Sequence, residues 1–359
     1  MNQSSQASGD DTAIRIDGVW KIFGDRWQDA LKEIRENNAS KTTVLEDYNC
    51  VVGVADVSFD VKRGEIFCVM GLSGSGKSTL VRHINRLLEP SVGSIYVGGQ
   101  DVMKIQGDDL RRFRNERIAM VFQNFALMPH RSVLDNVAMP LEIRGVSKNQ
   151  RMDVAKRTLE MVELTGWGNK FAHELSGGMQ QRVGLARAIA ADPEILLMDE
   201  PFSALDPLIR RQLQSQFMDL ASVMNKTTVF ITHDLDEAVR IGHRIAIMRD
   251  GRVVQIGTPE EIVMHPADDY VSDFVAGISR LKVVRAGEVM QPIAEFESAH
   301  GGISEDAPLF STTDNLSVLI RAAIESDMPI RVQDESENIV GVITRVDLLT
   351  TVIEGTETS

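Results

Sequence analysis

The sequence predicts an α/β protein whose core is a largely parallel sheet, followed by a smaller α+β domain. Three apolar runs, IAMVF (118–122), EILLMD (194–199) and TTVFIT (227–232), have the length of buried strands and alternate with helical patterns. Such alternation is typical of a parallel sheet with helices packed against it. Beyond about residue 280 the alternation stops, and residues 281–359 carry five Lys/Arg against fourteen Asp/Glu, which is −9 of the chain's net charge of −14.

Composition and the chain start narrow the class of protein. Residues 1–12 are rich in Ser, Gln and Asp and predict a disordered lead-in. They are too polar for a signal peptide, and no apolar run approaches the roughly 20 residues of a membrane-spanning helix. The two cysteines suit a reducing compartment without a disulfide framework. We therefore expect an acidic cytosolic protein that does not bind nucleic acid and that reaches a membrane only through a partner.

A glycine-rich loop is the strongest chemical signal in the chain. The segments IRIDGVWKIFG and VADVSFDVKRGEIFCVMG predict strands, and the second one leads directly into GLSGSGKST (71–79), which a helical pattern follows. In a phosphate-binding loop of this spacing, glycines let backbone N–H groups wrap the phosphates, Lys77 reaches the β and γ oxygens, and Ser78 ligates Mg²⁺. The predicted nucleotide-binding residues here are Gly71, Ser73, Gly74, Ser75, Gly76, Lys77, Ser78 and Thr79.

Polar side chains follow three of the predicted strands. Asp199 ends one apolar run and predicts a second Mg²⁺ ligand, and Glu200 after it predicts the base that activates the attacking water. Gln123 and His233 follow the other two runs, at the strand ends that face the ligand crevice of such a sheet. Gln123 is placed to touch Mg²⁺ or the water, and His233 to bond the γ-phosphate, although each alone also fits an ordinary polar strand cap.

A second anion-binding pattern lies in ELSGGMQQRV (174–183). Ser176, Gly177 and Gly178 open a predicted helix, where free N–H groups and the helix dipole favour an anion. The plain alternative is a serine N-cap with flexible glycines. The loop at 71–79 already serves one nucleotide, so one chain has no evident use for both patterns.

Residues 14 to about 278 resemble the ATP-binding subunit of an ABC transporter. GLSGSGKS is similar to Walker A, Gln123 to the Q-loop, LSGGMQQ to the signature, ILLMDE to Walker B, SALD with Asp206 to the D-loop, and His233 to the switch histidine. Phe23 in KIFG looks like the aromatic that stacks on adenine, with Trp20 a weaker candidate. The resemblance implies a P-loop ATPase with a parallel-sheet core, an antiparallel β subdomain and a helical subdomain. It also implies a head-to-tail dimer, in which the signature of one copy faces the ATP of the other.

Two departures from a minimal ATPase subunit, an insert at 24–54 and the acidic C-terminal region, narrow the resemblance further. The insert carries Trp27, Ala30, Leu31 and Ile34 at helical spacing with a stop at 37–38, and it resembles the insert of glycine betaine and proline importers. The alternative explanation of the insert is a surface elaboration unrelated to these importers.

The segment beside Gln123, FQNFALMPHRSVLDNVAMPL, resembles the region where the family binds a membrane permease. Phe125, Leu127 and Met128 are therefore candidates for that contact or for ordinary subdomain core.

The acidic C-terminal region, 281–359, resembles one repeat of a CBS domain. AGEVMQP followed by MPIRVQDESENIVGVITRVDLLTTV is similar to the order helix, strand, turn, strand, helix, and a single repeat implies that two copies pair across a dimer. Thr344 and Asp347 match a pattern that holds adenine nucleotides in some CBS modules. The same Thr-x-x-Asp is also a capping box, which needs no ligand.

The predicted domains are thus a lead-in at 1–12, an ATPase domain at 13–280 and a CBS-like domain at 281–359. With ATP and Mg²⁺ as cofactors, we expect the ATPase subunit of an importer for a small quaternary or methylated amine. It would lie on the cytoplasmic face of the inner membrane, bound to a permease and served by a solute-binding protein. Import of an amino acid or another osmolyte is the alternative, and a non-transport ABC ATPase acting on nucleic acid or ribosomes is a distant one.

Overall fold

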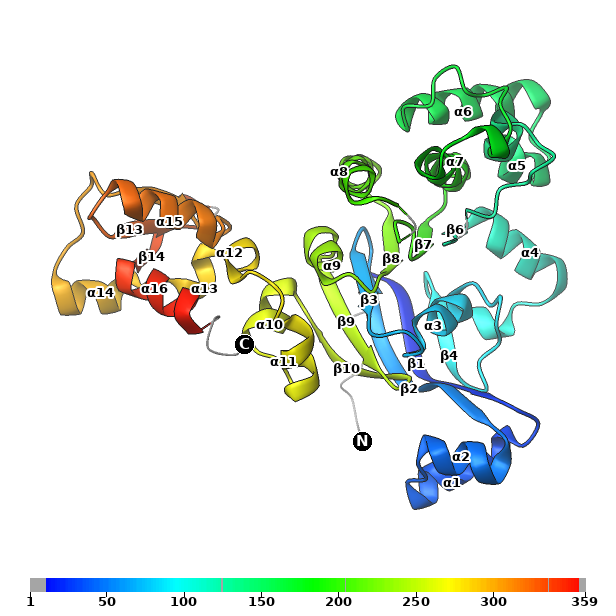
Figure 1. Ribbon diagram of the computed structural model, residues 1–359, viewed down its shortest axis with the longest axis horizontal. Helices are drawn as coiled ribbons and strands as arrows, with labels where there is room; N and C mark the ends of the chain where they lie inside the picture. The colour runs from blue at the N-terminus through cyan, green and yellow to red at the C-terminus, as the bar shows by residue number, and fades with distance from the viewer. Residues whose placement is uncertain (1–10, 124, 204, 335, 355–359) are drawn as a thin grey trace. The chain divides into compact units, whose positions relative to one another are not determined.

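A computed structural model describes residues 11–123, 125–203, 205–334 and 336–354. The chain forms two compact units that divide between Ile256 and Gly257 (Figure 1). The predicted boundary at 280/281 therefore lies C-terminal to this division. Residues 1–10 of the predicted lead-in lie outside the described residues, and the first strand begins at Thr12.

The six-stranded sheet of the first unit has the order β10-β9-β3-β8-β7-β6. Its strands are β3 (Ile66–Met70), β6 (Ile118–Val121), β7 (Ile195–Asp199), β8 (Thr227–Ile231), β9 (Arg244–Arg249) and β10 (Arg252–Gly257). The neighbours from β9 to β6 pair in parallel, and every residue of β3, β7 and β8 is buried. The apolar runs 194–199 and 227–232 are thus interior strands of the parallel part of the sheet, as the sequence predicts, whereas the run 118–122 forms the half-buried edge strand β6.

A second, antiparallel sheet of the same unit has the order β2-β1-β4-β5. It consists of β1 (Thr12–Phe23), β2 (Val51–Lys62), β4 (Val92–Val97) and β5 (Gln100–Asp101). The insert connects β1 to β2 through helices α1 (Trp27–Asn37) and α2 (Lys41–Tyr48). Ala30, Leu31 and Ile34 of α1 are buried, and the helix ends at Asn38 with a left-handed φ of 51°, so the predicted helical spacing and its stop are confirmed.

Helices cover the sheets of this unit, and α5, α6 and α7 pack on one another as a helical group (green in Figure 1). The remaining helices have these bounds: α3 (Lys77–Ile84), α4 (Gly107–Glu116), α5 (Val133–Ile143), α6 (Lys148–Met161), α7 (Gly177–Ala190), α8 (Pro207–Met224) and α9 (Leu235–Ile241), with short 3₁₀ turns η1 (Val102–Lys104) and η2 (Ala172–Glu174). In the part of the chain that the structure describes, no helix has the length and apolar character needed to cross a bilayer.

The second unit has its own four-stranded sheet, in the order β11-β14-β13-β12. Its elements are α10 (Pro259–Met264), α11 (Asp269–Val275), α12 (Arg280–Val283), α13 (Ala286–Val289), β11 (Gln291–Pro292), α14 (Ile293–His300), β12 (Leu309–Ser311), α15 (Leu316–Glu325), β13 (Ile330–Gln333), β14 (Ile339–Ile343) and α16 (Arg345–Glu354). The expected order helix, strand, turn, strand, helix runs from α15 to α16.

The unit begins at 257 because helices ahead of residue 281 pack on its core. Met264 of α10 and Leu281 of α12 join the apolar cluster around Val332 and Leu348. Glu260 and Arg285 form an ion pair at 2.7 Å. The composition changes near 281, but side-chain packing, which composition does not record, sets the earlier division.

Candidate functional site

The loop from Gly71 to Gly76 joins the buried strand β3 to helix α3. Gly71, Gly74 and Gly76 have φ values of 147°, 79° and 100°, which favour glycine. A Cβ atom at Gly76 would collide with the carbonyl oxygen of Gly53 in β2. Gly76 also caps α3 without any side-chain hydrogen bond, so the first N–H groups of the helix stay open to a ligand. The loop therefore has the backbone of an anion cradle.

Lys77 and Ser75 bring buried polar atoms to this cradle. The Lys77 ammonium donates to the carbonyl oxygens of Gly71 at 2.7 Å and Leu72 at 3.0 Å. Burial lowers the pKa of Lys77, and the charges of Glu200 and Asp199 partly oppose that effect. The buried Oγ of Ser75 has no hydrogen-bond partner among the described residues. An unpaired hydroxyl beside open N–H groups and an ammonium fits a bound phosphate chain.

Ser78 and Asp199 meet, as the sequence predicts for two ligands of one metal ion. Ser78 Oγ donates to Asp199 Oδ1 at 2.7 Å, and Asp199 is 3% exposed at the end of β7. Arg82 of α3 lies 3.3 Å from the other carboxylate oxygen of Asp199. Within the described residues no group of three or more His, Cys, Asp or Glu side chains could hold a metal. A hydroxyl and one carboxylate fit Mg²⁺ that keeps water and phosphate ligands.

The three predicted catalytic residues meet at one atom, Oε2 of Glu200. His233 Nδ1 lies 3.0 Å from it, and Gln123 Nε2 lies 3.4 Å from it. Glu200 has a left-handed φ of 47°, and its N–H donates to Ile231 of the neighbouring strand at 3.1 Å. Its side chain is 17% exposed, whereas that of His233 is 57% exposed. The arrangement presents a carboxylate at the edge of the sheet with two polar groups that orient it.

We call Gln123, Glu200 and His233 the proposed catalytic cluster. Gln123 belongs to this cluster rather than to the Ser78–Asp199 pair. Its hydrogen bonds in the structure go to Glu200 and to Ser203 Oγ, both at 3.4 Å. Ser203 in turn donates to the backbone oxygen of Glu200 at 3.0 Å. The sequence reading missed Ser203 and Arg82. Ser203 opens the SALD stretch three residues after the acid, a signal that could have suggested a turn closing on Glu200.

Phe23 lies at the end of β1 with a partly open ring. It is 39% exposed, and Lys21 Nζ lies 5.1 Å from the ring centroid. Gly53 separates this ring from Thr79, because a Cβ atom at Gly53 would lie 2.7 Å from the Phe23 ring and 3.5 Å from the Thr79 methyl group. Trp20, the weaker candidate, is 3% exposed in the core of the insert. Of the two rings, Phe23 is therefore the one that can stack on a base.

The signature residues lie at the start of α7. Ser176 Oγ accepts a long hydrogen bond of 3.4 Å from the N–H of Met179, and Ser176 and Gly177 are exposed. In the described part of the chain no hydrogen bond joins Ser176, Gly177 or Gly178 to the loop at 71–79. Asp206 is exposed and caps α8 by accepting from Ile209 N–H at 3.1 Å. Within the described residues, one chain thus leaves Ser176, Gly177 and Gly178 without a hydrogen bond to its own phosphate loop.

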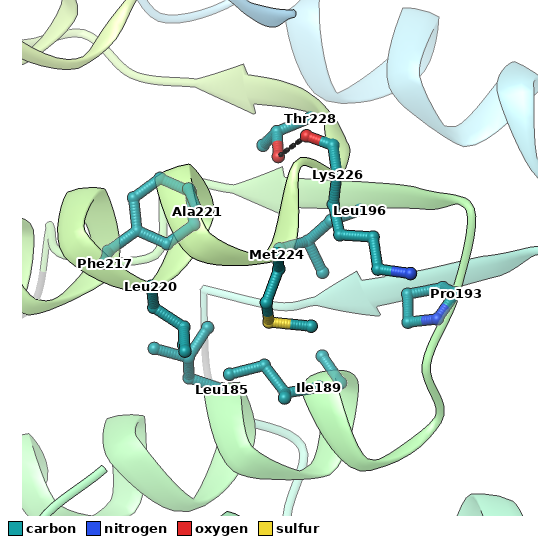
Figure 2. Close-up of a pocket in the computed structure, with 11 residues that line it drawn as sticks. Leu185, Ile189, Pro193, Leu196, Phe217, Leu220, Ala221, Met224, Lys226 and Thr228 are labelled. Atoms are coloured by element: carbon teal, nitrogen blue, oxygen red, sulfur yellow. Dashed lines mark hydrogen bonds between the residues drawn. The ribbon is translucent and has the colours of Figure 1, made fainter. Parts of the chain in front are cut away.

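A groove of about 350 Å³ lies beside the segment after Gln123. Apolar side chains of β6, α5 and the connecting segment line it, including Met120, Phe122, Met128, Met139 and Ile143. Met128 is 37% exposed, so the groove presents one of the three predicted permease contacts; Phe125 and Leu127 are half-buried and do not line it. A smaller apolar gap of about 20 Å³ separates α7 from α8 (Figure 2).

Comparisons with known proteins agree with this geometry. The ABC transporter family model matches residues 54–203. The glycine betaine transport ATP-binding protein OpuAA of Bacillus subtilis is 51% identical over 278 residues, which are 77% of this chain and 66% of that protein. The trimethylamine N-oxide transport ATP-binding protein TmoW of Pelagibacter ubique is 41% identical over 333 residues, 93% of this chain and 95% of that protein. A dimeric, post-hydrolysis structure of the cassette MJ0796 with ADP and Pi has a TM-score of 0.58 and 31% identity, covering 68% of this chain and 98% of that one.

Proposed function

The chain belongs to the ATP-binding subunits of ABC transporters, and we propose that it hydrolyses ATP to drive uptake of a small quaternary or methylated amine. The observation that carries the ATPase assignment is the meeting of Gln123, His233 and Glu200 next to a glycine cradle with an unpaired Ser75 hydroxyl. The names of relatives over most of the chain, which include glycine betaine and trimethylamine N-oxide transport, support the amine cargo.

The chain's own residues divide the chemistry among them. The open N–H groups of α3 and Lys77 hold the phosphates, and Phe23 stacks on the base. Mg²⁺ held by Ser78 and Asp199 would neutralise charge on the phosphate oxygens. Glu200 accepts the proton of the attacking water, His233 orients that carboxylate, and Gln123 holds the water against it.

The signature residues act in a second copy of the chain. Ser176 and Gly177 are exposed on a helix N-terminus that, among the described residues, makes no hydrogen bond to the chain's own phosphate loop, as a site shared between two copies requires. The dimeric form of the similar cassette MJ0796 supports the same arrangement. ATP then closes the dimer, and loss of the γ-phosphate contact after hydrolysis loosens it.

The cargo passes through a separate permease, with a solute-binding protein upstream of it. The apolar groove beside Gln123 is the surface that we assign to a cytoplasmic helix of the permease, which would bind the ATPase to the cytoplasmic face of the membrane. Because that groove adjoins the segment that carries Gln123, permease movement reaches the catalytic cluster by a short path.

The second unit is the part that we assign to CBS-like pairing between two copies. Ile324 on α15 and Val346 and Leu349 on α16 are 75%, 70% and 61% exposed, an apolar surface that pairing would cover. The Thr344–Asp347 pair at the start of α16 forms a capping box. Thr344 and Asp347 bond each other, with the Thr344 N–H and hydroxyl 2.8 and 2.7 Å from Asp347 Oδ2.

Deletion of the gene in its host, with uptake of radiolabelled glycine betaine, choline, trimethylamine N-oxide and proline, tests the function. We expect uptake of at least one methylated amine to fall to background, with wild-type chain but not Glu200→Gln restoring it. Loss confined to proline or another amino acid would overturn the cargo. Unchanged uptake of every compound, together with salt-sensitive binding of the purified chain to DNA or RNA, would overturn transport itself.

A further inference from the structure

Arg187 is a buried cation near the C-terminal end of α7 that the mechanism above does not use. It is 7% exposed, and burial lowers the pKa of its guanidinium. Its Nη1 donates to the carbonyl oxygen of Ala126 at 2.6 Å and its Nη2 to that of Phe125 at 2.8 Å. Among the described residues its partners are these carbonyls and no carboxylate, so the two hydrogen bonds are what compensates the buried charge.

The two residues that Arg187 holds are strained. Phe125 and Ala126 have φ values of 57° and 47°, the left-handed region that side chains other than glycine avoid. Each such residue costs on the order of 1–3 kcal/mol and persists only where the surroundings hold it in place. Two of them in succession, with both carbonyl groups bonded to one guanidinium, form a turn that depends on Arg187.

This turn lies between two parts of the chain that act in different ATP sites of the proposed dimer. It follows Gln123, which bonds Glu200 and Ser203 in the chain's own catalytic cluster. The helix that carries Arg187 begins at Ser176, eleven residues earlier, a distance of about 16 Å along a rigid α-helix. Ala126 and Arg187 also line the groove assigned to the permease. The turn thus follows Gln123 of the catalytic cluster, is bonded to the signature helix α7, and lines the groove.

The contacts of α7 with α8 are less directional. Figure 2 shows Leu185 and Ile189 of α7 facing Leu220 and Met224 of α8 across the small apolar gap. Apolar packing of this kind tolerates small sliding movements, since it has no preferred angle. The paired hydrogen bonds of Arg187 do have one, because a planar guanidinium donates its N–H groups only in a fixed fork geometry.

We propose that Arg187 is a positioning residue that fastens the 125–126 turn to α7, so that Gln123 and Ser176 move as one body. Gln123 acts in the chain's own site and Ser176 in that of the second copy, so this link makes one site sensitive to the state of the other. Because it rests on the proposed function, its test must separate loss of the link from loss of the ATPase.

The test uses full-length chain and measures ATP hydrolysis, binding of a fluorescent ATP analogue, and ATP-dependent dimerisation in a Glu200→Gln background. We expect Arg187→Met to lower kcat by roughly 10–100-fold, the usual scale for misplacing a reacting group by about 1 Å. Its affinity for the analogue stays at the wild-type value, and its dimerisation needs more ATP. Arg187→Lys, which keeps the charge but not the fork, gives an intermediate kcat.

Two further variants separate positioning from simple stability. Arg182→Met removes another arginine of α7, one that bonds Val162 and Glu163 instead of the turn, and it should keep the wild-type kcat. Ala126→Gly in the Arg187→Met background should recover part of the rate, because glycine adopts a positive φ without strain.

The link is overturned if Arg187→Met or Arg187→Lys keeps the wild-type kcat, if Arg182→Met loses as much, or if Ala126→Gly restores nothing. Should Arg187→Met not fold, the comparison of Arg187→Lys with Arg182→Met decides the matter alone. A wild-type chain that neither hydrolyses ATP nor dimerises with it as Glu200→Gln would instead overturn the proposed function.

Discussion

Helices α3 and α16 each follow a strand of their own unit, yet only the N-terminus of α3 is open to a ligand. At α3 the cap is Gly76, which offers no side chain, and Ser75 Oγ nearby has no partner among the described residues. At α16 Thr344 and Asp347 bond each other, with Asp347 N–H donating back to the Thr344 hydroxyl at 3.2 Å. The second carboxylate oxygen of Asp347 accepts from Gln291 at 2.8 Å.

The difference teaches that a helix N-terminus binds an anion only where its own side chains leave the N–H groups free. Glycine at α3 leaves them free, and the capping box at α16 bonds the N–H groups of Thr344 and Asp347. Helix α7 lies between these cases, because the hydrogen bond from Met179 N–H to its Ser176 cap is long, at 3.4 Å, and glycines follow the serine. An incoming phosphate oxygen can compete with a cap of that length, whereas at α16 it would also have to displace the Asp347 carboxylate from Thr344.

The catalytic cluster next to α3 gives the largest expected effect. Glu200→Gln removes the proton acceptor but keeps the shape, so hydrolysis should fall by roughly 10²–10⁴-fold, the usual contribution of a general base. ATP binding remains, and the ATP-bound dimer accumulates. Single-turnover hydrolysis and gel filtration with ATP measure the two effects. A variant that hydrolyses ATP at the normal rate would assign the base to another residue.

The intermediate helix, α7, gives the next largest effect. Ser176→Arg places a long side chain where we propose that the second copy's phosphate binds. We expect hydrolysis to fall by roughly 10²–10³-fold, the scale for losing one donor to developing charge. Binding of an ATP analogue to the monomer should not change, which distinguishes this variant from changes at Lys77. Normal dimerisation of Ser176→Arg with ATP would contradict the shared site.

The other end of α3 should respond to acid. His83 is fully buried, its Nδ1 lies 2.6 Å from the Leu88 oxygen, and burial lowers its pKa to about 4 from 6.5. The unfolded chain therefore binds this proton first, so the stabilisation is complete above pH 6.5 and is lost as the pH falls toward 4. The free energy of unfolding should drop by up to about 1.4 kcal/mol per pH unit in that window.

Urea denaturation between pH 7 and pH 4.5 measures this slope. His83→Asn keeps a donor near the Leu88 oxygen but cannot titrate, so its unfolding free energy should vary less with pH than that of the wild type. Equal slopes for the two proteins would mean that other groups cause the acid sensitivity.

The smallest effect is expected at α16, where the capping box serves stability alone. Asp347→Ala should lower the stability of the second unit by about 1 kcal/mol, the usual cost of losing a helix cap. The rate of ATP hydrolysis and the affinity for ATP should not change. Isothermal titration with AMP and ATP provides the sharper check: heat of nucleotide binding that depends on Asp347 would mean that a ligand can open the box.

Much of the site could be predicted because its signals are local. The glycines of 71–79, the acid pair at 199–200 and the helical spacing of the insert each lie within a few residues, where backbone sterics and periodicity act directly. The meeting of Gln123 and His233 at Glu200 was also predictable in outline, since ends of neighbouring parallel strands lie at one edge. Their grouping without Ser78 was not, because side-chain direction at a strand end depends on its neighbours.

By itself, the sequence determined the phosphate cradle, the acid pair, the parallel-sheet core and the existence of a second domain, all through short-range patterns. Only the tertiary structure decided where the units divide and that Gln291 bonds the second carboxylate oxygen of Asp347. It also decided that Arg82 holds Asp199 and that Arg187 holds the 125–126 turn. Each of these depends on partners 56 or more residues apart, or on the packing of helices against a core. Their hydrogen bonds form only after the chain has folded, so no local pattern records them.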